Sequence, residues 1–439
     1  MDGHLSTCVP GADGRGPRPL RILLSAYACE PGKGSEPGIG WRWALNLARR
    51  GHDVWVLTRA NNREAIEAAR PQEQAPSLRF VYYDLPSWAR RWKRGGRGVR
   101  LYYVLWQWGA YRLARRLHRE ARFHIAHHIT FGVFRHPSFM AFLDIPFVFG
   151  PVGGGEQAPR PLRRTFPLRG YLLDLARNAA NWAVRFDPLM AATYRRAAIT
   201  LCKTRETLRR IPARYQDKCL VHVEVGIDIP QPGWAERRRR AHEGLRVLYV
   251  GRMLYWKGVH LGLRAFARFR ESHPDTRFTL IGSGCDEAWL RHQAEELGLA
   301  QAVHWVPWLE HSAVMRAYHR HDVFLFPSLH DSSGNAVLEA LAHGLPVVCL
   351  NLGGPAVLVD ASCGFRIEPG PAEDVVAGLA AALAALADNP VLSEAMSRAA
   401  VERARRQFSW SRQTARMERL YSALAAEELR ERVACRTVR

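Results

Sequence analysis

Two successive runs of strand–helix alternation, separated by a single break, constrain this 439-residue chain more than any other feature. In both runs, short apolar, β-branched or aromatic segments alternate with longer segments whose apolar residues recur at helical spacing. Strands that are apolar throughout are buried on both faces, as in parallel sheets covered by helices. We therefore predict an α/β protein with two domains, each a doubly wound, Rossmann-like sheet.

The break falls at Ile229–Gly244, which holds prolines and a run of arginines and has no strand pattern. We interpret it as a linker, or a linker that leads into a solvated helix. The expected boundaries are a disordered segment at 1–20, a first domain at 21–228, the linker at 229–244, a second domain at 245–410 and a C-terminal helix at 411–439 that packs back on the first domain. The expected strands are Arg21–Ala26, Val54–Thr58, Leu78–Tyr83, Ile125–Ile129, Phe147–Phe149, Ile199–Cys202 and Leu220–Val225, then Val247–Val250, Phe278–Ile281, Val303–Val306, Val323–Phe326, Val347–Leu350 and Phe365–Ile367.

The charge balance points to a polyanionic partner. Lys and Arg total 63 against 41 acidic residues, a formal net charge of +22. Nucleic acid, an anionic membrane face or a phosphorylated ligand would each suit this excess. No apolar run has the length of a membrane span, the first residues lack the apolar core of a signal peptide, and the eight cysteines are scattered without a CxxC pair. We expect a cytoplasmic chain with reduced thiols and without a metal site.

Two loops with ligand-binding character follow expected strands. Glu30–Gly40 contains glycines that let backbone N–H groups approach a ligand, and it leads into a helix whose N-terminus favours an anion. Gly251–Gly258 places Arg252 and Lys257 at the end of a strand in the second domain, where two cations suit a pyrophosphate. An ordinary surface loop and a solvated basic loop are the respective alternatives.

A third segment, Pro327–Pro346, combines a polar loop with a helix that is expected to begin near Gly334. The first amides of that helix could bind a phosphate. Asp331 in the loop and Glu339 in the helix could accept hydrogen bonds from sugar hydroxyls. The alternative for Glu339 is an ion pair with a neighbouring cation. A fourth segment, Ile125–Thr130, carries adjacent histidines at a strand end, and histidines there can hold a hydroxyl. The alternative is a structural or merely exposed histidine, since the chain has 18 of them.

Together these segments resemble the retaining GT-B glycosyltransferases of family 4, whose fold has two Rossmann-like domains facing a central cleft. The resemblance covers about Arg21–Tyr421. Its motifs in the second half are Arg252 with Lys257, Gly282–Gly284, Pro327–Ser328, Asp331 spaced from Glu339 as in the family's E-x7-E, and Gly344–Val347. In the first half, Ser25–Trp41 and Gly150–Glu156 resemble a polysaccharide-synthesis branch. Two positions differ from the family pattern. Asp331 stands where the family usually has Glu, so its carboxylate is one methylene shorter. The family's N-G-[VI]-D turn reads Val225-Gly226-Ile227-Asp228 here.

The resemblance assigns roles to individual residues. Arg252 and Lys257 would neutralise the leaving pyrophosphate, Glu339 would hold the donor ribose, and Asp331 would contact the transferred sugar. His127 is the candidate active-site histidine, with His128 and His136 as rivals. The other implied donor-site residues are Gly38 near the phosphates, Gly251 and Gly282 in the glycine turns, Val306 and Trp308 along the base, and Gly334, Asn335, Ala336 and Val337 at the helix N-terminus.

The resemblance further implies transfer of a hexose, with retention and without metal or cofactor. The donor would be a UDP- or GDP-sugar and the acceptor a lipid-linked saccharide of cell-surface polysaccharide biosynthesis. An epimerase or phosphorylase of the same architecture is one alternative. A basic nucleic-acid-binding protein is another, although no helix-turn-helix, RNP or zinc pattern appears, and we expect no nucleic-acid partner.

Two segments, Arg90–Arg122 and Arg160–Arg196, interleave arginines with aromatic residues. Basic, aromatic helices of this kind lie well on an anionic bilayer surface. We expect peripheral attachment to the inner face of the cell membrane, the alternative being merely solvated basic faces.

Overall fold

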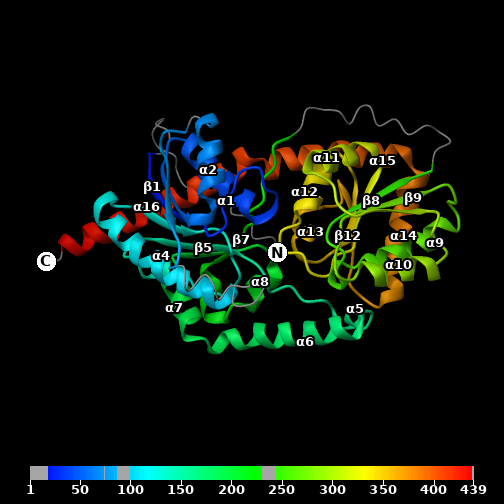
Figure 1. Ribbon diagram of the computed structural model, residues 1–439, viewed down its shortest axis with the longest axis horizontal. Helices are drawn as coiled ribbons and strands as arrows, with labels where there is room; N and C mark the ends of the chain where they lie inside the picture. Colours follow the sequence, from blue (N-terminus) through cyan, green and yellow to red (C-terminus); the bar gives the residue numbers. More distant parts are fainter. Residues whose placement is uncertain (1–17, 74, 87–98, 230–243, 438–439) are drawn as a thin grey trace.

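The structure, a computed structural model, describes residues 18–73, 75–86, 99–229 and 244–437. Two parallel sheets lie next to each other along the long axis of the molecule (Figure 1). The first sheet has seven strands in the order β3-β2-β1-β4-β5-β6-β7, and the second has six in the order β10-β9-β8-β11-β12-β13. Both begin with the order 3-2-1-4-5-6 of a doubly wound fold, so the prediction of two such sheets is confirmed.

The first sheet is formed by β1 (Arg21–Ser25), β2 (Asp53–Arg59), β3 (Leu78–Tyr83), β4 (Ile125–His128), β5 (Phe147–Val152), β6 (Ile199–Cys202) and β7 (Cys219–Val221). Its helices are α1 (Ser35–Arg49), α2 (Arg63–Ala69), α4 (Val99–Ala121), α5 (Arg160–Arg163), α6 (Leu168–Ala183), α7 (Pro188–Arg196) and α8 (Arg205–Arg210), with short turns η3 (Phe139–Phe142) and η4 (Val184–Phe186). The expected strand Leu220–Val225 is wrong in its second half: after Val221 the chain leaves the sheet.

The second sheet is formed by β8 (Arg246–Val250), β9 (Arg277–Ile281), β10 (Val303–Val306), β11 (Val323–Phe326), β12 (Val347–Leu350) and β13 (Gly364–Ile367). Its helices are α9 (Val259–Arg270), α10 (Glu287–Glu296), α11 (His311–Arg320), α12 (Asn335–Ala342), α13 (Gly353–Leu358), α14 (Ala372–Asp388) and α15 (Pro390–Arg403), followed by the π-helical turn η8 (Ala404–Phe408). Strands β11 and β12 are buried along their whole length, as expected for central parallel strands.

Strand alternation divides the core of the first sheet between its two faces. Ile22 and Leu24 belong to the cluster that includes α1, whereas Leu23 belongs to the cluster that includes α4. Successive strand residues point to opposite faces, so a strand covered on both sides must be apolar throughout. These helices therefore hold the carboxyl ends of the strands in place, and the loops that follow the strands carry the site.

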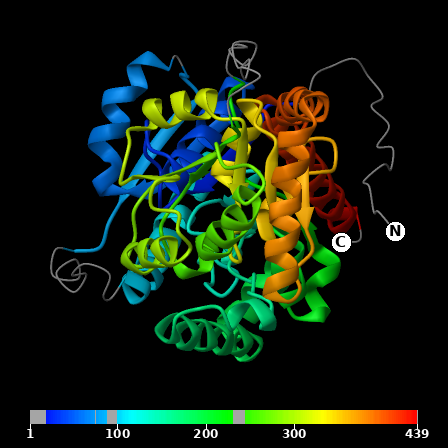
Figure 2. The same ribbon diagram turned by 90° about the vertical axis from the view of Figure 1, so that its right-hand side faces the viewer.

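The last helix, α16 (Trp410–Thr437), returns to the first sheet and packs against α1 and β4. Ile227 forms a β-bridge with Ser409 just before it, and the Arg50 guanidinium pairs with Glu418 on it. The two domains are therefore joined again near Trp410. Figure 2 shows the same arrangement from the side. Most of the expected linker, at 230–243, and the expected disordered segment up to residue 17 lie outside the described residues.

Within the described ranges, no single helix is long and apolar enough to cross a membrane. Among the same residues, α14 and the helical segment Pro390–Phe408 together have the length and apolar composition of a membrane span, but the chain bends by 103° between them. Val375 and Leu379 of α14 are buried in the core of the second domain.

Candidate functional site

A cavity of about 550 Å³ lies between the two domains. The first domain contributes the loop Gly32–Ser35, the start of α1 and the turn Val225–Asp228, and the second contributes α11 and α12. Each of these helices follows a strand, so the cavity lies where ligands bind in doubly wound sheets. Three residues singled out from the sequence line it: Gly38, Asn335 and Glu339.

Glu339 presents a carboxyl group to this cavity from the second turn of α12. The Tyr318 hydroxyl of α11 donates a hydrogen bond to its Oε2 at 3.0 Å. Burial raises the pKa of Glu339 to about 7, although the hydrogen bond from Tyr318 acts in the opposite direction. No cation pairs with Glu339 among the described ion pairs, so the ion-pair alternative is not what the structure has. This carboxyl group is placed to accept hydrogen bonds from a ligand's hydroxyls.

Lys257 and Asp331 come together from two different loops of the second domain. The Lys257 Nζ lies 2.5 Å from Asp331 Oδ2, and both side chains are largely buried. Burial alone would raise the pKa of the Asp331 carboxyl, but the Lys257 ammonium and two backbone amides outweigh it and lower that pKa. The sequence predicted both residues in the site and did not predict that they pair.

The loop before α12 is shaped around Asp331. Its Oδ1 accepts hydrogen bonds from the amides of Ser333 at 3.1 Å and Gly334 at 2.7 Å. Gly334 has a left-handed φ of +73°, and a Cβ there would lie 2.8 Å from Leu358 Cδ1, so glycine is required. The following amides, of Asn335, Ala336 and Val337, begin the helix and have no carbonyl partner within it. They form a ready site for an anion.

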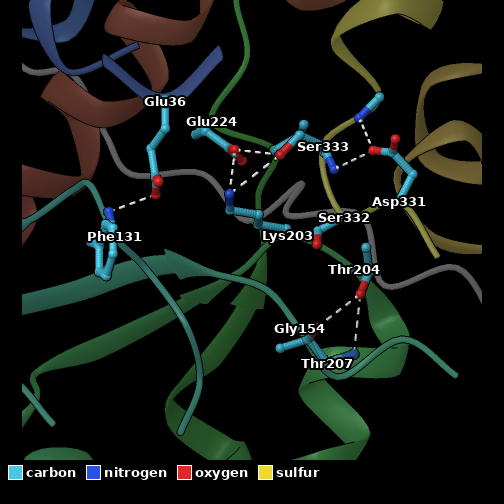
Figure 3. A network of polar contacts seen from close by, with 12 residues as sticks. Glu36, Phe131, Gly154, Lys203, Thr204, Thr207, Glu224, Asp331, Ser332 and Ser333 are labelled. Carbon is cyan, nitrogen blue, oxygen red and sulfur yellow. Dashed lines mark hydrogen bonds and ion pairs between the residues drawn. The ribbon is translucent and has the colours of Figure 1, made fainter. Parts of the chain in front are cut away.

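A network of buried polar side chains connects the two domains at this loop (Figure 3). Lys203 Nζ, at the end of β6, lies 2.5 Å from Glu224 Oε1 and 3.3 Å from Ser333 Oγ, and Ser333 donates to Glu224 at 2.6 Å. Ser332 donates to Glu156 at 3.2 Å. Burial alone would lower the pKa of Lys203, but the carboxylates of Glu224, Glu36 and Glu156, with Glu224 contributing most, together outweigh it and raise that pKa.

Sequence reasoning missed this network. Lys203 directly follows β6, and Glu224 comes three residues after β7 ends. Ligands bind at the carboxyl ends of buried parallel strands, so a polar residue that directly follows such a strand is a candidate site residue. The position of Lys203 therefore could have been recognised from the sequence. For Glu224 the signal was hidden by the expected strand Leu220–Val225.

The three histidine candidates lie within the packing of the first domain. His127 is fully buried; its Nδ1 lies 2.5 Å from the Tyr421 hydroxyl of α16 and its Nε2 lies 2.5 Å from the Gly150 carbonyl oxygen. Burial lowers its pKa to about 3. His128 is equally buried between Tyr103 and Ser138, and the His136 ring packs against Tyr103. With both ring nitrogens engaged, His127 connects α16 to the first sheet in this arrangement.

The other predicted site residues lie around the ends of β8, β9 and β10. Gly251 and Gly282 touch each other: a Cβ on Gly282 would lie 1.9 Å from the Gly251 carbonyl oxygen. These glycines allow two neighbouring strand ends to approach. Arg252 is exposed, Val306 is partly buried at the end of β10, and Trp308 is 72% exposed. In the described part of the chain, no group of three or more His, Cys, Asp or Glu side chains is placed to hold a metal ion.

Comparison with known proteins agrees with this geometry. Residues 232–403 match the family model of the glycosyl transferases group 1. Glycogen synthase of Mycobacterium tuberculosis is 36% identical over 186 residues, which are 42% of this chain and 44% of that protein. The D-inositol 3-phosphate glycosyltransferase of Streptomyces avermitilis is 30% identical over 260 residues, which are 56% of this chain and 55% of that protein. The chain thus spans about half the length of the curated relatives it matches.

Solved structures match almost the whole chain. Sucrose-phosphate synthase from Thermosynechococcus elongatus superposes with a TM-score of 0.65 at 18% identity, covering 93% of this chain and 100% of that one. Anabaena HepE in complex with UDP superposes with a TM-score of 0.61 at 17% identity, covering 92% and 100%. At such identities the likeness concerns the fold, and it confirms the predicted GT-B architecture. The chain therefore has the GT-B fold, and residues 232–403 within it are similar to the glycosyl transferases group 1 family.

Proposed function

We propose that this protein transfers a hexose from a UDP- or GDP-sugar to a saccharide acceptor, and that it belongs to the retaining enzymes of family 4. The observation that carries the proposal is the arrangement around α12. Glu339 faces the interdomain cavity, while the first amides of the helix and the Lys257–Asp331 pair lie at its start. A carboxyl group that accepts hydrogen bonds from hydroxyls, an anion site and a cation in this arrangement suit a sugar joined to a nucleoside diphosphate.

In the proposed reaction, Glu339 accepts hydrogen bonds from the donor ribose. Lys257 and Arg252 stabilise the negative charge that grows on the pyrophosphate as its bond to the anomeric carbon breaks. Asp331, held by Lys257, contacts a hydroxyl of the transferred sugar. The acceptor hydroxyl attacks the anomeric carbon on the face that the pyrophosphate leaves, and its proton passes to a departing phosphate oxygen. The sugar therefore keeps its configuration, and the chain's cations carry out the charge stabilisation without a metal.

The name of one distant relative, a phosphatidylinositol N-acetylglucosaminyltransferase subunit of Schizosaccharomyces pombe, is that of an enzyme that glycosylates a lipid. We extend the proposal to a lipid-linked saccharide acceptor of cell-surface polysaccharide biosynthesis, with the protein attached peripherally to the inner face of the cell membrane. The formal charge of +22 supports an anionic partner of this kind.

The test is a screen of UDP- and GDP-sugars against the purified full chain, with thermal stabilisation and nucleotide release as readouts. We expect one nucleotide to raise the melting temperature and release of that nucleotide only when acceptor is added, with activity retained in EDTA. Isomerisation of the sugar without acceptor would favour an epimerase, and dependence on inorganic phosphate a phosphorylase. Stabilisation by oligonucleotides but by no nucleotide sugar would instead favour the nucleic-acid-binding alternative.

A further inference from the structure

Helix α6 turns its apolar side toward solvent. Leu168, Leu172 and Trp182 on this helix are 75%, 56% and 52% exposed, and Phe186 in the adjoining η4 is 68% exposed. The helix lies along one edge of the molecule, below both sheets in the two views (Figure 1, Figure 2). A surface helix of a globular protein normally turns its apolar stripe toward the core, so this orientation is the reverse of the usual one.

The polar side of α6 is buried and fixed in place. Asp174 is 1% exposed and contacts Arg163 Nε at 2.7 Å and His330 Nε2 of the second domain at 2.9 Å. Asn181 is 3% exposed, and its Nδ2 donates to the Gly154 carbonyl at 2.9 Å. Rotation of the helix to bury its leucines would expose or break these contacts. The outward apolar face is therefore specified by the fold.

The charges around this face are of one sign. Arg160, Arg164, Arg169 and Arg185 are exposed, and the Arg185 guanidinium lies over the Trp182 ring at 5.0 Å from its centroid. Within 160–189 the two acidic residues face other partners: Asp174 is buried, and Asp187 accepts hydrogen bonds from the first amides of α7. Apolar side chains surrounded by arginines, with both carboxylates of 160–189 turned to other partners, suit a partner surface that has an apolar interior and an anionic boundary.

We propose that α6, with η4 and the exposed Leu189 of α7, lies in the interface of an anionic lipid bilayer. Its leucines and Trp182 would reach the acyl boundary, and its arginines would contact lipid phosphates. A second copy of this chain on the same face would bring arginines against arginines, which disfavours a symmetric dimer. Leu101 and Trp108 of α4 are also exposed, and α4 and α7 both pack against η3, which extends the surface.

This interface would place the membrane beside the loop Gly251–Gly258 of the second domain. A Cβ on Gly170 of α6 would lie 2.8 Å from the Tyr255 ring, so the helix contacts the loop that carries Lys257 directly. The Phe166 and Tyr255 rings lie 4.8 Å apart. The inference deepens the proposed function and rests on it for the lipid-linked acceptor. Vesicle binding itself needs neither donor nor acceptor, so it is tested separately.

The test is sedimentation of the full chain with phosphatidylcholine vesicles that contain phosphatidylglycerol. We expect Leu168→Gln with Leu172→Gln to weaken partitioning by about tenfold or more, because two apolar side chains lose their acyl contact. The matched control is Val391→Gln with Leu429→Gln, at positions 79% and 62% exposed, which should bind like the parent chain. All four positions are exposed, so melting temperatures should be unchanged.

A second variant, with Gln at Arg164, Arg169 and Arg185, should lose its preference for anionic over neutral vesicles. Equal binding by the parent chain and the leucine variant would overturn the proposal. The proposal would also be overturned if the parent chain did not bind vesicles but self-associated in sedimentation velocity, while the leucine variant was monomeric. Failure of nucleotide binding in the same preparations would count against the proposed function alone, because nucleotide affinity is measured without vesicles.

Discussion

Ser333 of the second domain donates a hydrogen bond to the Glu224 carboxylate of the first domain, at 2.6 Å. Lys203 contacts both, so one buried cation, one carboxylate and one hydroxyl connect the two domains beside Asp331. The loop that precedes α12 is thereby held from the opposite side of the cleft. In this arrangement the loop that precedes α12 is shaped by contacts from both halves of the molecule.

Removal of the Ser333 hydroxyl should loosen that contact. We expect Ser333→Ala to lower the free energy of unfolding by about 1 kcal/mol, the usual net contribution of one hydrogen bond. Glu224→Ala should cost roughly 3 kcal/mol, because it leaves the Lys203 ammonium buried without its partner. Chemical denaturation measures both, and the double variant should cost less than the sum. Additive losses would show that the two side chains do not interact.

Lys257→Ala should lower kcat/KM for the donor by roughly 10²-fold or more, because charge on the leaving pyrophosphate grows in the transition state. The sequence alone predicts that the variant stays folded and that turnover is affected more than folding. Because Asp331 is paired with Lys257, we also expect a lower melting temperature. Adding Asp331→Asn should restore the melting temperature but not the activity. Steady-state kinetics close to those of the parent chain would remove Gly251–Gly258 from the site.

Nucleotide binding should strengthen as pH rises from 6 to 8. Burial raises the pKa of Glu339 to about 7, so its carboxylate, the better acceptor for ribose hydroxyls, forms only above that pH. Titration calorimetry at several pH values with UDP and GDP measures the change. Glu339→Gln should bind weakly at every pH, and a parental pH dependence in that variant would assign the effect elsewhere.

The same variant should unfold less easily than the parent chain in alkaline solution. A carboxyl group with a raised pKa in the folded state destabilises that state once it ionises, so its penalty appears as pH rises from its unfolded value through 7. We expect the free energy of unfolding of Glu339→Gln to exceed that of the parent chain by on the order of 1 kcal/mol at pH 8 and to differ little from it at pH 5. Thermal denaturation at both pH values tests this, and an equal gain at both would exclude ionisation as its cause.

His127→Gln should affect stability more than binding. The ring connects Tyr421 to the Gly150 carbonyl inside the first domain, so its loss should cost about 1–3 kcal/mol. Nucleotide affinity should stay within about twofold of the parent chain, since His127 is not part of the cavity wall. Tyr421→Phe should cost part of the same free energy. A stable His127→Gln protein that binds nucleotide but has lost transfer would restore the catalytic role implied by the resemblance.

Much of the fold follows from local sequence. Strands β11 and β12 are apolar and buried throughout, a pattern typical of strands covered on both faces, so helix-covered parallel sheets could be predicted. The ligand-binding loops could be placed as well, because the carboxyl ends of parallel strands share one edge. Glu339 was found in this way from residue type and position, whereas Gly38 and Asn335 were assigned from the family resemblance, and all three line the cavity.

Tertiary structure decided what those residues contact. Lys203 and Glu224 meet Ser333 from another domain, and no local pattern encodes a contact between residues more than a hundred positions apart. His127 lies in the buried strand β4, and its partner Tyr421 belongs to the last helix. Periodicity shows that α6 has an apolar and a polar side, but buried partners such as His330 determine which side faces inward. The sequence by itself therefore determined the elements and the edge of the site, and packing between distant segments determined the pairs within it.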